Sequence, residues 1–317
     1  MPPDATASVI AAVDGARLRV VRFPLPDGAP ARRGTVLIHP GWSEFSEKYV
    51  EMAGDLHRRG FGVVVFDPRG QGYSQRLDAA DRRGHIDDFR KFVGDLSVVM
   101  DHVRATETGP VVLLAHSMGG LITLEWLIEG HGSDLAGVVL SAPLTNLFQS
   151  RLKRVFVAGV LAAGKALGRG AAALPGVKEH SWTFDGNVLT QDPSRHERFR
   201  QLQLSAPDAV AGLPKFDWLH AALAGMKRIQ APGAMDRLSG PILLVSAAQD
   251  ETVDPTHHHR LAADYPDLFD LVIVPGARHE LMMEADAYRD QFFAAFDQYI
   301  DERVPGTSKA DSSVPRT

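Results

Sequence analysis

The stretch VVLLAHSMGGLITLEW, residues 111–126, decides the fold of this chain. Five apolar residues run into His-Ser-Met-Gly-Gly at 116–120, and an apolar segment that suits a helix follows. A buried strand that stops at a serine and turns on small residues predicts a sharp strand–turn–helix junction that presents Ser117 as a nucleophile. The alternative interpretation is a polar strand end followed by a glycine-rich bend, and the rest of the sequence must distinguish the two.

Small residues surround Ser117 at the positions where a sharp turn demands them. Ala115 and Gly119 stand two places before and after it, where a large side chain would clash. The usual pattern has glycine at both places, but alanine is small enough for the same turn. The N–H of Met118 would lie at the start of the following helix, where the helix dipole favours a developing oxyanion. The sequence therefore predicts Ser117 as nucleophile and the Met118 amide as one oxyanion donor.

Strands and helices alternate on both sides of this junction. Continuous apolar runs with β-branched residues predict strands that are buried on both faces, as in a parallel sheet. Apolar residues at helical spacing predict the helices between them. The alternation predicts an α/β fold, a mostly parallel sheet with helices on both faces. The predicted elements are a hairpin within 9–23, strands at 35–40, 61–68, 111–115 and 137–143, and helices at about 47–59, 86–104 and 118–130.

The alternation breaks between about 144 and 238, where no buried-strand pattern is seen, and then resumes. Strands are again expected within 241–250 and 270–279, with helices near 256–264 and 285–301. A break of this length inside a regular pattern predicts an insertion at the edge of the sheet, which would form a helical cap or lid. The expected division is a core of 1–143, a cap of 144–238, a second core part of 239–303 and a disordered tail of 304–317.

Composition excludes several classes of function. With 44% hydrophobic and 23% charged residues, the 317-residue chain has the composition of an ordinary globular protein. A net charge of −5 gives no general reason to expect nucleic-acid binding. The chain has no cysteine, which excludes disulfides, thiolate metal sites and a cysteine nucleophile. We expect no metal and no cofactor, and we interpret the histidine run at 257–259 as a surface feature, since neighbouring helical residues point in different directions.

A serine nucleophile needs a base, and the base needs an acid that orients it. In this fold the chain order is serine, then Asp or Glu, then histidine. Asp250 follows one predicted strand and His279 follows the next, so both would emerge at the carboxyl edge of the sheet near Ser117. The alternatives are a turn or cap role for Asp250 and a surface loop for His279. Asp254 and Glu251 are rival acids, but they lie further from the strand end.

The second oxyanion donor is expected in the loop after the first parallel strand, HPGWSEFSEKY at 39–49. Pro40 and Gly41 force a turn there, which makes the N–H of Trp42 the best candidate. The alternative is a tight turn and nothing more. Glu280, next to His279, and Glu284 are expected to cap or flank the last helix.

DPRGQGYS at 67–74 is a further motif, and it lacks the lysine and the spacing of a phosphate-binding loop. Asp67, Arg69 and the two glycines of this motif are expected to hold loops in shape rather than to do chemistry.

Six stretches together resemble one family of enzymes. The chain is similar to α/β-hydrolases of the monoacylglycerol lipase and lysophospholipase group, and most closely to the bacterial lysophospholipase L2 family. The resemblance implies the α/β-hydrolase fold, with nucleophile, acid and base at Ser117, Asp250 and His279. It also implies oxyanion amides at Trp42 and Met118. The family often has a histidine where this chain has Pro40. The matching stretches are PGWSEFSEKYVEMAGDL, GFGVVVFDPRGQGYSQRL, GHIDDFRKFVGDL, LLAHSMGG, NVLTQDPSRHERFRQL and PGARHELMMEADAYRD.

The motif residues predict a serine hydrolase that acts through an acyl-enzyme. The resemblance implies that its substrate is the carboxylic ester of a single-chain lipid, a lysophospholipid or a monoacylglycerol. A serine peptidase of the proline-iminopeptidase type is the first alternative. It needs acidic cap residues to hold an ammonium group, and residues 144–178 contain no Asp or Glu. A non-catalytic binding protein on the same fold is the second, but such a protein would typically lack one member of the triad.

The first part of the insertion is strongly basic. Its apolar run, residues 155–163, is too short to span a bilayer. One interpretation is a cap that contacts an anionic membrane, so that a cytoplasmic protein lies at the inner face of that membrane. The other is a cap helix that packs on the core and leaves its basic side chains in water. The basic residues are Arg151, Lys153, Arg154, Lys165, Arg169 and Lys178.

Overall fold

The computed structural model describes most of the chain outside the segment 148–182. The expected tail and all six basic residues of 144–178 lie outside the described residues. Within the described ranges, no helix is both long enough and apolar enough to cross a membrane. The described residues are 1–30, 32–76, 83–84, 86–147, 157, 159–161, 163–164, 167–168, 172 and 183–303.

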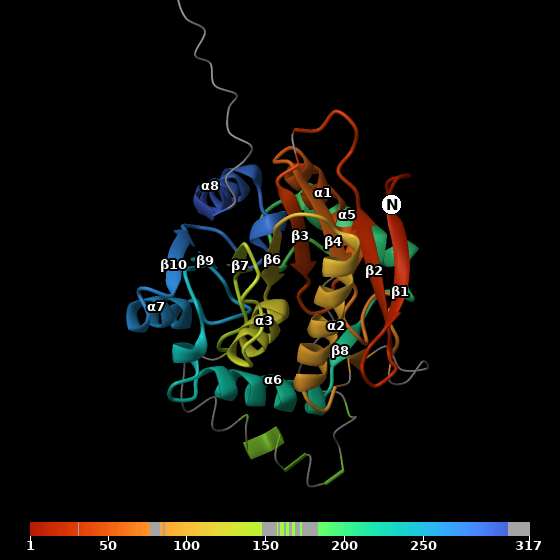
Figure 1. Ribbon diagram of the computed structural model, residues 1–317. Helices are drawn as coiled ribbons and strands as arrows, with labels where there is room; N and C mark the ends of the chain where they lie inside the picture. Colours follow the sequence, from red (N-terminus) through yellow and green to blue (C-terminus); the bar gives the residue numbers. More distant parts are fainter. Residues whose placement is uncertain are drawn as a thin grey trace, which may run out of the picture.

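One eight-stranded sheet forms the centre of the molecule, in the order β1-β2-β4-β3-β6-β7-β9-β10 (Figure 1). The first two strands pair antiparallel as the predicted hairpin, and β2 pairs antiparallel with β4. Every later neighbour pair is parallel, which confirms the predicted mostly parallel sheet. The strands are β1 Thr6–Ala11, β2 Arg17–Phe23, β3 Gly34–His39, β4 Phe61–Phe66, β6 Val111–His116, β7 Gly137–Ser141, β9 Ile242–Ala247 and β10 Phe269–Val274.

Helices cover both faces of this sheet, which explains the continuous apolar runs. Alternate residues of one strand enter two separate apolar clusters: Leu37 belongs to one, and Val36 and Ile38 belong to the other. The first cluster includes residues of α2, α3, α6 and α7, and the second includes residues of α1 and α8. The helices are α1 Val50–His57, α2 Arg90–Thr106, α3 Met118–Ile128, α6 Phe216–Ile229, α7 Pro255–Asp264 and α8 Asp286–Arg303, with short 3-10 turns η1 Ser46–Tyr49, η2 Met235–Arg237 and η3 Leu281–Met283.

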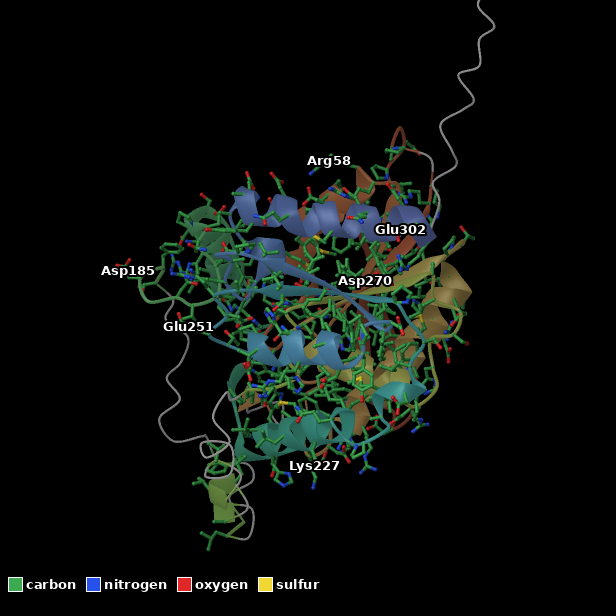
Figure 2. The ribbon with its side chains drawn as sticks, turned by 90° about the vertical axis from the view of Figure 1, so that its left-hand side faces the viewer. Arg58, Asp185, Lys227, Glu251, Asp270 and Glu302 are labelled. Atoms are coloured by element: carbon green, nitrogen blue, oxygen red, sulfur yellow. The ribbon has the colours of Figure 1, made fainter. Side chains whose placement is uncertain are left out.

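The described elements between β7 and β9 include α5 Pro193–Ser205, β8 Gly212–Pro214 and α6. The strand β8 pairs with β5, Arg83–Gly84, as a separate two-stranded sheet. The sequence pattern did not indicate β8, because three residues carry no periodicity and their partner lies in a distant loop. The helix α6, which carries Lys227, lies at the opposite end of the molecule from α8, which carries Glu302 (Figure 2).

The histidine run at 257–259 lies in α7, and the surface interpretation is wrong for its central residue. His258 is fully buried. Its Nδ1 lies 2.8 Å from Ser246 Oγ on β9, and its Nε2 lies 2.8 Å from the carbonyl oxygen of Pro143 after β7. Burial lowers the pKa of His258 to about 4, so the ring is neutral at pH 7. The residue ties α7 to two strands of the sheet.

Candidate active site

Ser117 stands at the turn between β6 and α3. Its backbone has φ 50° and ψ −114°, a conformation that costs energy for any residue with a side chain and is common at functional sites. Its N–H donates to the carbonyl of Ser141 at 3.1 Å, which holds the turn against β7. A Cβ atom on Gly119 would lie 2.4 Å from the carbonyl oxygen of His39, so only glycine fits there. The small-residue pattern around Ser117 thus has a steric cause.

The structure brings Ser117, Asp250 and His279 together from the ends of β6, β9 and β10. His279 Nε2 lies 2.9 Å from Ser117 Oγ, and His279 Nδ1 lies 2.6 Å from Asp250 Oδ2. The three residues are 8%, 7% and 3% exposed in the order serine, aspartate, histidine. A hydroxyl, an imidazole and a carboxylate in one hydrogen-bonded chain can activate the hydroxyl as a nucleophile.

Asp250 is held as an ionised acceptor. Its Oδ1 accepts the N–H groups of Thr252 and Val253 at 2.8 and 3.0 Å, which leaves Oδ2 for His279. Burial raises the pKa of Asp250, but the charge of His279, its hydrogen bond and the two amides outweigh burial and lower the pKa overall. The carboxylate can therefore fix the imidazole tautomer that has its proton on Nδ1.

The two rival acids lie elsewhere. Asp254 caps the start of α7, where its Oδ1 accepts from the N–H and hydroxyl of Thr256 at 3.1 and 2.6 Å. Its Oδ2 accepts from the side-chain amide of Asn146 at 2.8 Å. Glu251 is exposed at the surface (Figure 2). Within the described residues, neither carboxylate is hydrogen-bonded to His279.

The loop after β3 lies directly against Ser117. A Cβ atom on Gly41 would lie 3.2 Å from Ser117 Cβ and 3.0 Å from His116 Cδ2. The ring of Trp42 packs on the ring of Trp218 from α6, with 4.8 Å between their centres. Neither the Trp42 amide nor the Met118 amide donates to another residue in the described part of the chain. Both N–H groups are therefore available to an oxygen bound at this site.

His39, one place before the family's usual histidine position, belongs to the core. It is 1% exposed, and its ring lies 4.9 Å from the ring of Phe66. Its Nδ1 lies 3.4 Å from Thr123 Oγ1. Burial lowers the pKa of His39 to about 3, so the side chain is neutral at pH 7.

A buried group of charges lies behind the site. Lys48 Nζ lies 2.5 Å from Glu44 Oε1 and 2.7 Å from Glu280 Oε2. Burial lowers the pKa of Lys48, but the two carboxylates outweigh burial and raise it overall. Burial raises the pKa of Glu44, but Lys48, His116 and a hydrogen bond from Tyr49 lower it to about 2. Glu44 is therefore a carboxylate and Lys48 an ammonium at neutral pH.

Sequence reasoning missed this group. The spacing of Glu44 and Lys48, four residues apart in WSEFSEKY, was the available signal. The carboxylate of Glu280, a residue expected to cap or flank the last helix, pairs with Lys48. His116 lies between this group and His279: its Nε2 is 3.6 Å from Glu44 Oε1, and its ring centre is 4.9 Å from that of His279.

Hydrogen bonds join the stretch NVLTQDPSRHERFRQL, residues 187–202, to the loop that carries His279. The N–H of Glu280 donates to the carbonyl of Leu189 at 2.9 Å. The carboxylate of Glu284 accepts the N–H groups of Gln191 and Arg278 at 2.8 and 2.9 Å. Thus the start of α5 and the loop that carries His279 are positioned as one unit.

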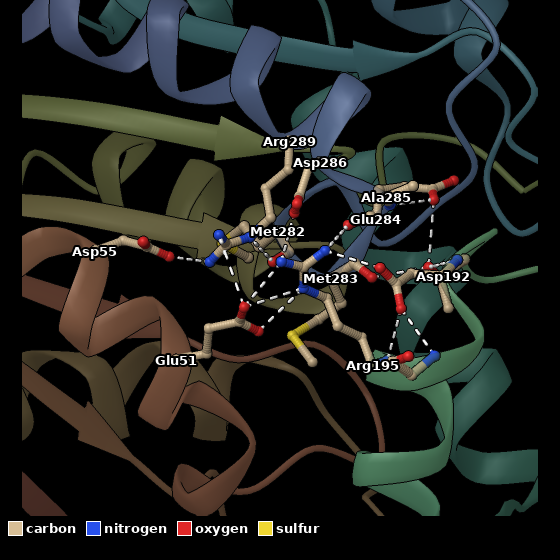
Figure 3. A network of polar contacts seen from close by, with 12 residues as sticks. Glu51, Asp55, Asp192, Arg195, Met282, Met283, Glu284, Ala285, Asp286 and Arg289 are labelled. Carbon is tan, nitrogen blue, oxygen red and sulfur yellow. Dashed lines mark hydrogen bonds and ion pairs between the residues drawn. The ribbon is translucent and has the colours of Figure 1, made fainter.

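Arg195, at the start of α5, takes part in a network of polar contacts that Figure 3 shows. Its Nη2 bonds Glu51 of α1 at 2.8 Å and Asp286 of α8 at 2.7 Å, and its Nη1 bonds Asp192 at 2.9 Å. The N-terminal turn of α5 is therefore tied to both α1 and α8.

The described residues contain no group of three or more His, Asp or Glu side chains that could hold a metal ion. The fold and the arrangement around Ser117 define the class: this is an α/β-hydrolase. More particularly, the chain belongs to the family described as serine aminopeptidase, S33 (Hydrolase_4), which matches residues 30–286.

Individual relatives agree with this assignment and with the resemblance predicted from the sequence, which is confirmed. The chain is 32% identical over 295 residues to lysophospholipase L2 of Escherichia coli K12, covering 87% of this chain and 82% of that protein. It is 29% identical over 272 residues to probable lysophospholipase L2 of Haemophilus influenzae, covering 85% and 84%. A crystal structure of a soluble variant of monoglyceride lipase from Saccharomyces cerevisiae shares the fold, with a TM-score of 0.74 and 22% identity over 94% of this chain and 95% of that one.

Proposed function

We propose that this chain is a serine hydrolase that cleaves the carboxylic ester of a single-chain lipid, a lysophospholipid or a monoacylglycerol, through an acyl-enzyme. The hydrogen-bonded chain from Ser117 through His279 to Asp250, with distances of 2.9 and 2.6 Å, carries the proposal. The names of the relatives, lysophospholipase L2 and monoglyceride lipase, support the substrate class.

The geometry suits a two-step acyl transfer. His279 Nε2 takes the proton of Ser117 Oγ as this oxygen attacks the ester carbonyl carbon. The amides of Trp42 and Met118 donate to the carbonyl oxygen as it becomes an oxyanion. His279 then gives the proton to the leaving alcohol, and a water molecule attacks the acyl-enzyme by the same route. Asp250 keeps the imidazole oriented and stabilises its charged form.

A peptidase of the proline-iminopeptidase type is the competing function, and the description of the family favours it as the alternative. Such an enzyme needs acidic groups that face a substrate ammonium. Glu44 and Glu280 are acidic and near the site, but Lys48 engages both, and residues 144–178 contain no Asp or Glu. The ester function therefore has the stronger support.

A hydrolysis panel tests the proposal. Monoacylglycerol, lysophosphatidylcholine, lysophosphatidylethanolamine, short p-nitrophenyl esters and a proline-initiated peptide amide are each offered to the wild type and to Ser117→Ala. We expect ester turnover by the wild type only, and labelling of Ser117 by a fluorophosphonate probe. Because the residues act as a unit, the Ser117→Ala/His279→Ala double variant should be little worse than either single variant. Turnover of the peptide alone, or labelling of a different serine, would refute the ester function.

We propose also that residues 144–238 act as a cap whose basic first part contacts an anionic membrane. Each basic residue near such a surface contributes about 1 kcal/mol. The test is co-sedimentation with phosphatidylglycerol vesicles, which should fall as salt is raised. Replacing Arg151, Lys153 and Arg154 by Gln should slow hydrolysis of vesicle-borne substrate and leave a soluble short-chain ester unaffected. Equal binding to neutral and anionic vesicles would leave only the solvated-cap interpretation.

A further inference from the structure

Gln71 of the DPRGQGYS motif contacts both neighbours of Trp42. Its side chain is fully buried. Its Oε1 accepts the N–H of Ser43, and its Nε2 donates to the carbonyl oxygen of Gly41 at 3.4 Å. A carboxamide can make both bonds in one orientation only, since the N–H of Ser43 requires an acceptor and the carbonyl of Gly41 requires a donor.

The bond to Gly41 bears directly on Trp42. The carbonyl of Gly41 and the N–H of Trp42 belong to the same peptide unit, which is planar and trans, so the two groups point in opposite directions. A donor that holds the carbonyl therefore fixes the direction of the N–H. Ser117 lies within contact distance of this peptide, because a Cβ atom on Gly41 would lie 3.2 Å from Ser117 Cβ.

Two further polar groups of this turn have partners. The N–H of Gly41 donates to Glu44 Oε2 at 2.5 Å, and the hydroxyl of Ser43 donates to the carbonyl of Ala211 at 2.8 Å. Ser43 has φ 63°, a left-handed conformation that a non-glycine residue adopts only when its surroundings hold it there. Among the described residues, the Trp42 N–H is left without an acceptor.

We propose that Gln71 is a positioning residue that directs the Trp42 N–H toward the oxyanion. The inference rests on the proposed function and goes beyond it, because Gln71 acts through the Gly41–Trp42 peptide. The rest of the motif supports the same loop: Asp67 Oδ1 accepts the N–H and hydroxyl of Ser46 at 2.8 and 2.6 Å. This confirms the expectation that Asp67 holds a loop in shape.

Two variants separate positioning from folding. Gln71→Glu keeps the shape of the side chain and the acceptor for Ser43, but when ionised it sets a second acceptor against the carbonyl of Gly41. Gln71→Met removes both bonds without adding charge. The control is Gln75→Glu in the same loop, an exposed residue whose Oε1 accepts the N–H of Arg17 at 3.1 Å.

The first readouts are kcat and KM for a short p-nitrophenyl ester. The value of kcat is expressed per active site that a fluorophosphonate labels. The second readout is the affinity for an alkyl trifluoromethyl ketone. Loss of a whole oxyanion donor costs about 10²–10³-fold in kcat. We expect both Gln71 variants to lose about 10-fold or more in kcat with KM little changed, and to bind the ketone correspondingly more weakly. Gln75→Glu should match the wild type.

The pH profile supplies a readout that a general loss of structure would not give. A protonated Glu at position 71 can donate to the carbonyl of Gly41, and an ionised one cannot. The activity of Gln71→Glu relative to the wild type should therefore be higher at pH 5.5 than at pH 8. Wild-type kcat per labelled site in both variants, or a pH-independent ratio, would overturn the inference. A wild type that hydrolyses no ester would instead refute the proposed function.

Discussion

Lys48 and Glu280 form a buried ion pair, with 2.7 Å between Nζ and Oε2, that joins the segment after the Gly41–Ser43 turn to the residue after His279. The same ammonium group lies 2.5 Å from Glu44 Oε1, and the other oxygen of Glu44 accepts the N–H of Gly41. The two loops that bring Trp42 and His279 to Ser117 therefore share one cation. This sharing couples the position of the proposed oxyanion donor to the position of the proposed base.

Lys48→Met should be strongly destabilising, because it leaves Glu44 and Glu280 buried without a cation. Removal of one partner of a buried pair costs about 3–5 kcal/mol, and we expect a loss of that size in the free energy of unfolding, measured with urea. Lys91→Met is the control, since Lys91 pairs with Asp87 at the surface and should cost less than about 1 kcal/mol. Equal losses in the two variants would show that the buried cation is dispensable.

Asp250→Asn should lower kcat by orders of magnitude, because it favours the wrong tautomer of His279 and removes the stabilisation of the imidazolium. Asp254→Asn should leave kcat close to the wild type, since Asp254 bonds Thr256 and Asn146 instead. Steady-state kinetics on a soluble ester, with melting temperatures for both variants, makes the comparison. The opposite ranking of kcat would reject Asp250 as the orienting acid.

Gly41→Ala should slow catalysis without unfolding the chain. The added Cβ would lie 3.0–3.2 Å from His116, Glu44 and Ser117, so the turn that holds Trp42 must shift away from Ser117. We expect kcat to fall about 10-fold or more, a geometric effect of the kind that small displacements produce. Gly94→Ala, in α2 with open space around its Cβ, should instead stabilise by about 0.5–1 kcal/mol and leave kcat unchanged. Unchanged kcat in Gly41→Ala would show that a shift of this turn does not affect catalysis.

Local sequence signals predicted the elements of the sheet and the positions that meet at its carboxyl edge. Ser117, Asp250 and His279 each follow a continuous apolar strand, and parallel strands end at a common edge, so their proximity follows from topology. The pairing of Lys48 with Glu280 does not follow in the same way, since it joins residues 232 positions apart by their numbers.

The hydrophobic pattern of the sequence also did not predict which polar side chains are buried. His258 lies between two histidines of higher exposure, and nothing in HHH distinguishes the residue that faces Ser246 and Pro143. The side chain of Gln71 likewise finds its partners in a loop about 30 residues earlier. Such contacts depend on how loops pack over the sheet, and hydrophobic periodicity carries no information about them.

Glu51 should make the free energy of unfolding depend on pH in the acidic range. Burial raises the pKa of Glu51, but a hydrogen bond from Arg195 and the charges of Arg289, Arg198 and Arg195 lower it from 4.5 to about 2. A depressed pKa in the folded state contributes stability that is fully present above the unfolded value of 4.5 and is lost as pH falls through 2. The difference in unfolding free energy between the wild type and Glu51→Gln should therefore be constant above about pH 5.5 and shrink steadily from pH 4.5 to pH 2.5.

Urea unfolding at pH 7, 5.5, 4, 3 and 2.5 measures that difference. Glu197→Gln is the matched control: Glu197 pairs with Arg200 on α5 and its pKa is also lowered to about 2, but its side chain is exposed. Solvent and salt screen an exposed pair, so the effect of Glu197→Gln should be smaller at every pH and should vanish in high salt. A Glu51→Gln difference that stays constant down to pH 3 would show that the arginines do not hold the pKa of this carboxylate down, and that Arg195 ties α5 to α1 by packing alone.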